Sequence, residues 1–153
     1  MRLRYLILVP LLVGGVLTAG AAGGKVEYVG GTVAELNSGP KGLLVTTGDT
    51  HLVFQAQKVV YVVPWERINT LEYGQNVGRR YAMAVLVSPL LVLSKARRHY
   101  LTVGFTDDVG AQQVMVFRVD KDAIRTLLVS LEAKTNLLVS YQDDEARRAG
   151  KGN

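Results

Sequence analysis

The chain contains no cysteine, and among its 153 residues only two are histidine and one is tryptophan. The absence of cysteine excludes a disulfide scaffold, a thiolate metal site, a cysteine nucleophile and a lipid-modified cysteine. Charged residues are also few, at 20%, whereas hydrophobic residues make up 48% of the chain. This balance predicts one modest domain with a single core.

Residues 1–24 have the three-part order of a secretory signal. Arg2 and Arg4 precede an almost entirely apolar run, and small residues (AGAA) follow at 19–22. Residues 19–21 match the small-x-small cleavage rule, so we expect a signal peptide over residues 1–21. The alternative is an uncleaved anchor, because the apolar run approaches the roughly 20 residues of a membrane span. In either case we expect an exported protein, periplasmic or extracellular.

Short strands separated by turn sequences fill most of residues 26–119. Two pairs of alternating runs predict hairpins, residues 42–47 with 51–54 and residues 100–106 with 113–119. Three more strands are expected at 26–36, 58–63 and 68–73. The first of these carries Gly30-Gly31, which indicates a bend or a β-bulge.

The hydrophobic period then changes from two to about 3.6, which predicts one amphipathic helix over residues 120–136. Asp120 is the expected N-cap, and Asn136 is suited to a left-handed exit. The expected buried stripe consists of Ile124, Leu127, Leu128 and Leu131. A last strand is expected within 137–141 and a polar, frayed tail over 142–153. If the helix caps the strands, its deletion should unfold the domain.

These elements predict a mainly β (α+β) fold over residues 25–141, a small antiparallel barrel or curled sheet capped by a C-terminal amphipathic helix. The sequences LLVT (43–46), LVF (52–54) and VPWERI (63–68) resemble GRAM and bacterial pleckstrin-homology-like domains, as found in small exported bacterial proteins of unassigned function. The resemblance implies a seven-stranded barrel with a C-terminal helix and often a lipid or protein contact, and it does not imply an enzyme. It does not extend to a phosphoinositide pocket, because the hairpin over 43–54 lacks the corresponding Lys/Arg motif.

The segment over residues 79–99 is apolar in its centre and basic at both ends. Residues 81–94 carry no charge, and as a helix they would extend about 21 Å, short of the ~30 Å hydrocarbon core. One interpretation is a surface that contacts anionic lipid or an envelope protein, with cations meeting the headgroups. The expected contact residues are Arg79, Arg80, Tyr81, Leu86, Leu90, Leu91, Lys95, Arg97 and Arg98. The alternatives are a core element over 81–93, with the ligand or partner site elsewhere, or self-association through this patch.

No sequence motif indicates catalysis, a cofactor or a metal ion. The two histidines, His51 and His99, lack metal-ligand spacing, and neither a phosphate-binding loop nor a nucleophile elbow is present. Trp65 and Arg67 follow Pro64 at an expected sheet corner, where they could anchor a ligand or partner. The favoured interpretation makes Trp65 part of the core. Nucleic-acid binding is not expected, because the positive charge is small and mostly clustered.

The sequence therefore predicts an exported, non-enzymatic envelope module without a cofactor, which contacts a membrane surface or a protein partner through residues 79–99. The alternative is a soluble exported binding domain with residues 81–93 inside its core.

Overall fold

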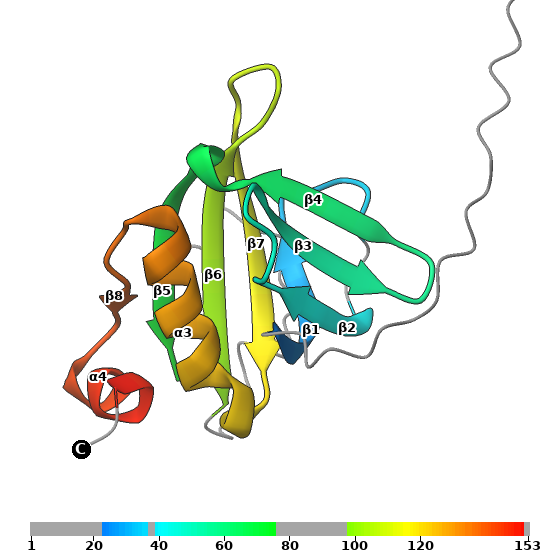
Figure 1. The fold of residues 1–153 in the computed structure, drawn as a ribbon. Helices are drawn as coiled ribbons and strands as arrows, with labels where there is room; N and C mark the ends of the chain where they lie inside the picture. The colour runs from blue at the N-terminus through cyan, green and yellow to red at the C-terminus, as the bar shows by residue number, and fades with distance from the viewer. Residues whose placement is uncertain (1–22, 37–38, 76–97, 152–153) are drawn as a thin grey trace, which may run out of the picture.

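The computed structural model describes residues 23–36, 39–75 and 98–151, which form a mainly β α+β fold (Figure 1). The strands are β1 (Gly23–Gly31), β2 (Lys41–Val45), β3 (His51–Ala56), β4 (Val60–Pro64), β5 (Ile68–Gly74), β6 (His99–Thr106), β7 (Gln112–Val119) and β8 (Ser140–Tyr141). A short 3-10 helix, η1 (Trp65–Arg67), links β4 to β5. The helices are α3 (Lys121–Thr135) and α4 (Asp144–Lys151).

The described strands form one eight-stranded sheet in the order β4-β3-β2-β1-β7-β6-β5-β8. All pairs are antiparallel except the short β5–β8 pair. β4 and β8 are edges, so the sheet is open and the expected closed barrel is wrong. Strand β4 ends at Pro64, which has no N–H to donate, and η1 then turns the chain away.

Both predicted hairpins are confirmed. β2 pairs with β3 from Gly42↔Ala56 to Val45↔Val53, and β6 pairs with β7 along its whole length. The first strand ends earlier than expected, at Gly31, and its bulge lies between Tyr28 and Gly30 in the pairing with β7. It also begins earlier than expected, because Gly23 and Gly24 pair with β2 instead of ending the leader.

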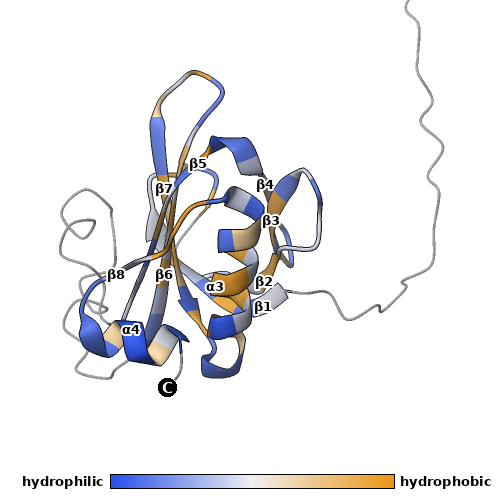
Figure 2. Cartoon of the chain, turned by 60° about the vertical axis from the view of Figure 1, so that its left-hand side comes forward, coloured by the Kyte–Doolittle hydropathy of each residue, from blue (hydrophilic) through white to orange (hydrophobic). Residues whose placement is uncertain are grey.

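Helix α3 covers one face of the sheet and completes the main core. Its buried residues are the predicted four, Ile124, Leu127, Leu128 and Leu131. Figure 2 shows apolar colour where α3 faces the strands. The helix ends at Asn136 in the left-handed conformation, as predicted, whereas the Asp120 side chain makes no capping hydrogen bond.

Part of the expected polar tail is the helix α4. The Asp143 side chain accepts a hydrogen bond from the Ala146 N–H (2.7 Å), which satisfies one of the free donors at a helix start. Ala146 is buried and belongs to the main core. Gly150 is also buried, close to Tyr141 and Leu128. Small residues on one side of α4 thus allow it to pack closely, and the tail is not frayed over 144–151.

The opposite face of the central strands carries a second set of buried apolar residues. Tyr100 of β6, Val114 and Val116 of β7, and Val29 at the β1 bulge are at most 6% exposed, yet they lie outside the main core. Their neighbours in sequence, such as Leu101 and Met115, belong to the main core. Strand β6 is therefore buried on both faces, as is more typical of a central than of a half-exposed strand.

Candidate contact surfaces: the basic end and the seam

The first candidate surface is the end of the molecule where β5 finishes and β6 and α3 begin, here called the basic end. Val119, the last residue of β7, pairs with both Val26 of β1 and His99, the first residue of β6, so the three residues lie in one row. Exposed cations stand directly beside this row, at Lys25, Arg98 and Lys121. Two exposed aspartates, Asp120 and Asp122, lie at the start of α3 on the same end.

Gln75 and Arg98, which flank residues 76–97 in the sequence, both lie at the basic end. The Arg98 N–H donates to the Gln75 carbonyl (3.3 Å), and Gly74 pairs with Tyr100. Of the expected contact residues, the structure describes only Arg98, whose side chain is exposed. The others lie outside the described residues: Arg79, Arg80, Tyr81, Leu86, Leu90, Leu91, Lys95 and Arg97.

A hollow of about 550 Å³ lies beside the basic end, on β1, β2 and β7. Cations border it at Lys25, Lys41 and Arg118, and Leu43 contributes an exposed apolar side chain. Arg118 forms an ion pair with Glu27 in the same hollow. This site combines positive charge with apolar surface, and sequence reasoning missed it because its residues come from strands that are distant in the chain.

His99 lies just inside the basic end and contacts Tyr73. Its Nδ1 lies 2.6 Å from the Tyr73 hydroxyl, and the two rings are stacked with centroids 6.0 Å apart. Burial, and then the nearby charge of Lys121, lower the pKa of His99. Burial raises the pKa of Tyr73 to about 12, with a smaller contribution from Tyr141. This geometry favours a neutral imidazole that accepts the Tyr73 proton in a hydrogen bond.

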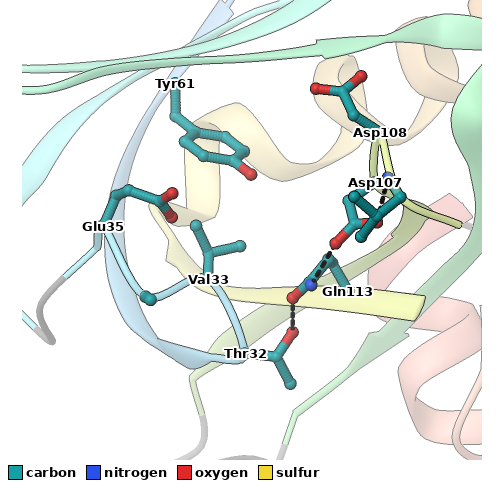
Figure 3. A pocket seen from close by; sticks show the side chains of 9 residues that line it. Thr32, Val33, Glu35, Tyr61, Asp107, Asp108 and Gln113 are labelled. Carbon is teal, nitrogen blue, oxygen red and sulfur yellow. Dashed lines mark hydrogen bonds between the residues drawn. The ribbon is translucent and has the colours of Figure 1, made fainter. Parts of the chain in front are cut away.

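The second candidate surface is the gap between edge strand β4 and the turn that joins β6 to β7, here called the seam. Tyr61 of β4 crosses it to contact Phe105 of β6, with ring centroids 6.1 Å apart. A hollow of about 300 Å³ lies beside Tyr61, bordered by Thr32, Glu35, Asp107 and Gln113 among others (Figure 3). A second hollow of about 230 Å³ shares Tyr61, Asp107 and Asp108 and extends toward His51 and Arg67.

The β6–β7 turn holds Asp107 in place. Its Oδ1 accepts the N–H groups of Val109 and Ala111, and its Oδ2 accepts the Gln113 side-chain amide (2.8 Å). The Gln113 bond, followed by the Ala111 bond, holds the pKa of Asp107 below its ordinary value. A fixed, ionised carboxylate therefore borders both hollows.

Tyr61 points between Glu35 on one side and Asp107 and Asp108 on the other (Figure 3). Burial, and then these three carboxylates, raise its pKa. Asp108 is paired with Arg67, whereas Glu35 has no hydrogen bond or ion pair with the rest of the described chain. The seam is thus the acidic counterpart of the basic end.

Trp65 and Arg67 have different surroundings. Trp65 is buried (7% exposed) and its indole N–H donates to the Gly48 carbonyl (2.9 Å), so it belongs to the core and offers no anchor at the surface. Arg67 is partly exposed and borders the second hollow of the seam. His51 borders the same hollow, but its Nδ1 lies 2.6 Å from the Thr50 hydroxyl and no bond joins it to Asp107 or Asp108.

Within residues 23–36, 39–75 and 98–151, no group of three or more histidine or acidic side chains is arranged to hold a metal ion. In those same ranges no helix is both long enough and apolar enough to cross a bilayer.

Comparison with known proteins gives no assignment. No protein-family model matches the chain, and no curated protein matches its sequence.

Proposed function

We propose that this chain is an exported, non-enzymatic envelope module of GRAM or pleckstrin-homology-like architecture, and that it contacts an anionic membrane surface through the basic end and residues 79–99. The observation that carries the proposal is the hollow of about 550 Å³ beside the basic end, where Lys25, Lys41 and Arg118 outnumber the carboxylates Glu27 and Asp120 and where Leu43 is exposed. An anionic lipid presents the complementary chemistry, a negative headgroup next to an apolar chain. Each cation near such a surface contributes about 1 kcal/mol.

The strand order supports the architecture. Seven strands follow one another as an antiparallel meander that is split between β4 and β5, with β1 beside β7 and a helix after the last strand. The resemblance of residues 43–68 to that family implies seven strands followed by a helix, which is the count of β1–β7 and α3, although the described sheet is open. In the part of the chain that the structure describes, neither histidine pairs with a carboxylate; the polar partners of His51 and His99 are Thr50 and Tyr73.

Vesicle flotation tests this proposal. Residues 22–153 would be mixed with phosphatidylglycerol or with phosphatidylcholine vesicles at low and high salt. We expect flotation with the anionic vesicles only, decreasing as salt screens the contact. Changing Arg79, Arg80, Arg97 and Arg98 to Gln should abolish it.

The matched control removes cations from elsewhere. Lys58 precedes β4, and Lys134 lies in the last turn of α3, at the opposite end of that helix from Lys121. A Lys58→Gln, Lys134→Gln variant should float like the wild type, and an Arg97→Gln, Arg98→Gln variant should float less. A folded wild-type chain that stays at the bottom of the gradient with anionic vesicles would refute the membrane contact.

The second candidate function, a soluble exported binding domain with residues 81–93 inside the molecule, is favoured by the second set of buried residues. Val29, Tyr100, Val114 and Val116 are buried although they lie outside the main core, and Tyr100 pairs with Gly74, close to Gln75 and Arg98. A Thr102→Cys variant tests this, because the chain has no other cysteine and Thr102 lies on the same face. If residues 81–93 lie inside the molecule, the thiol of the Thr102→Cys variant should be labelled slowly in the full chain and rapidly when a Gly-Ser linker replaces residues 81–94. In the control, a Val109→Cys variant, the thiol should be labelled rapidly in both chains.

A further inference from the structure

The seam contains an unpaired strand edge with little to prevent another strand from pairing. β4 lies at the end of the sheet and, among the described strands, pairs with β3 alone. Its sequence, VYVVP, carries no charge, and Val60 and Val62 are 62% and 47% exposed. Proteins usually protect exposed edges with charges, and Pro64 blocks only the last position here. The edge is therefore available for an added strand.

Side chains along β4 alternate between two faces, and this determines which residues an added strand would contact on each face. Val60 and Val62 are exposed on one face, whereas Tyr61 and Val63 lie on the other. Tyr61 contacts Phe105 and borders both hollows, and Val62 and Val63 border the second hollow alone. Side chains of an added strand lie beside those of β4 on the same face. Alternate residues of the strand therefore meet either exposed valines or the seam.

The charges of the seam determine which type of side chain of an added strand would bind there. The hollow of about 300 Å³ is bordered by Glu35, Asp107 and Asp108 and by no cation among its lining residues. Asp107 is held ionised by its turn, and Glu35 has no ion pair within the described chain. This hollow is therefore acidic on its own account. A lysine or arginine side chain complements it.

We propose that the seam binds an extended, basic peptide segment of a partner protein, which adds a strand to β4. Apolar side chains of the peptide lie beside Val60 and Val62, and a Lys or Arg between them enters the hollow formed by Glu35, Asp107 and Tyr61. Main-chain hydrogen bonds to β4 supply affinity, and the alternating side chains supply specificity. This site is separate from the basic end and does not depend on the proposed membrane contact.

Fluorescence anisotropy with short labelled peptides tests the proposal. The purified chain would be titrated against a Val-Lys-Val-Thr-Val peptide, its Val-Glu-Val-Thr-Val counterpart, and the lysine peptide with its backbone nitrogens methylated. We expect binding of the lysine peptide, weakened by salt, and loss of binding with each of the other two. Failure of the lysine peptide to bind, or equal binding of all three, would overturn the proposal.

Variants of the chain locate the site. Glu35→Gln should weaken binding of the lysine peptide about fivefold, the effect of one partly exposed ion pair. Asp122→Asn, which removes an exposed carboxylate from the first turn of α3, should leave binding unchanged. An equal loss in both variants would show general charge attraction and refute the site. Concentration-dependent dimerisation that Val62→Lys abolishes, without peptide binding, would assign β4 to a second copy of the chain instead.

Discussion

Two buried tyrosines differ in one respect, the partner of the hydroxyl. Tyr28 is 1% exposed, and its hydroxyl has no hydrogen-bond partner within the described chain. Burial, and then the charge of Tyr61, raise its pKa to about 12. Tyr73 is also buried, but its hydroxyl contacts His99 at 2.6 Å. The ring of each residue packs in the core, whereas only the second hydroxyl recovers what it loses by leaving water.

Removing each hydroxyl should therefore have opposite effects on stability. Tyr28→Phe should raise the free energy of unfolding by about 1 kcal/mol, because it removes a desolvated, unpaired group. Tyr73→Phe should lower it by about 1 kcal/mol, because it leaves His99 without its partner. Chemical denaturation of the two variants beside the wild type measures both changes. A loss of stability in Tyr28→Phe would show that its hydroxyl has a partner in solution.

His99 should make stability depend on pH in mildly acidic solution. Its pKa in the folded chain is below the ordinary 6.5, through burial and the charge of Lys121. As the pH falls from about 6.5 toward that lower pKa, the unfolded chain binds the proton first, so the free energy of unfolding decreases. Denaturation at several pH values, with His99→Gln as the comparison, should show a shallower decrease in the variant. A ring pKa at or above 6.5 by NMR would contradict this expectation.

The structural reason for Gly24 cannot be inferred from the sequence around it. It stands in a run of small residues that indicates a signal-peptide end, yet the structure places it in β1 against α3. A Cβ there would lie 2.7 Å from the Cβ of Ala123 and 2.6 Å from a methyl of Leu127. Only the tertiary contact explains the glycine, and nothing in the local pattern predicts it.

At the scale of elements, the sequence predicted what local periodicity determines. Both hairpins and α3 were predicted because alternation and the 3.6-residue stripe specify which side chains are buried. Helix α4 was missed, since DDEARRAGK has few apolar residues and its contacts are made by small ones, Ala146 and Gly150. The seam was missed for a related reason: Tyr61 and Asp107 meet only after β4 and the β6–β7 turn are placed in three dimensions.

The packing of α4 should be sensitive to one position. Ala146 is fully buried in the core, so Ala146→Asp would bury a charge and should lower the free energy of unfolding by at least about 2 kcal/mol. Arg148→Asp introduces the same side chain at an exposed position of the helix and should change it by less than about 0.5 kcal/mol. Thermal unfolding compares the two, and hydrogen exchange over residues 144–151 should increase only in the first. Equal exchange in both would mean that α4 is undocked in solution.

Across the whole molecule, charge is separated between two surfaces on different parts of one open sheet. The basic end lies where β5, β6 and α3 meet, and the acidic seam lies between β4 and the β6–β7 turn. One core joins them, because residues of β1–β7, α3 and α4 belong to a single buried cluster. The two proposed contacts therefore require the same folded unit, and neither can be retained in a fragment that lacks α3.

The stability of the folded unit should depend on the packing of α3 in the core. Leu131 is fully buried at the centre of the core, so Leu131→Ala should lower the free energy of unfolding by about 2–5 kcal/mol. Val129→Ala, on the exposed side of the same helix, should change it by less than about 0.5 kcal/mol. Deletion of residues 120–136 should abolish the cooperative melt and, with it, binding of the lysine peptide and flotation with anionic vesicles. If the deleted chain still melted cooperatively, α3 would be an accessory to a sheet that is stable without it, and the two surfaces could be studied apart.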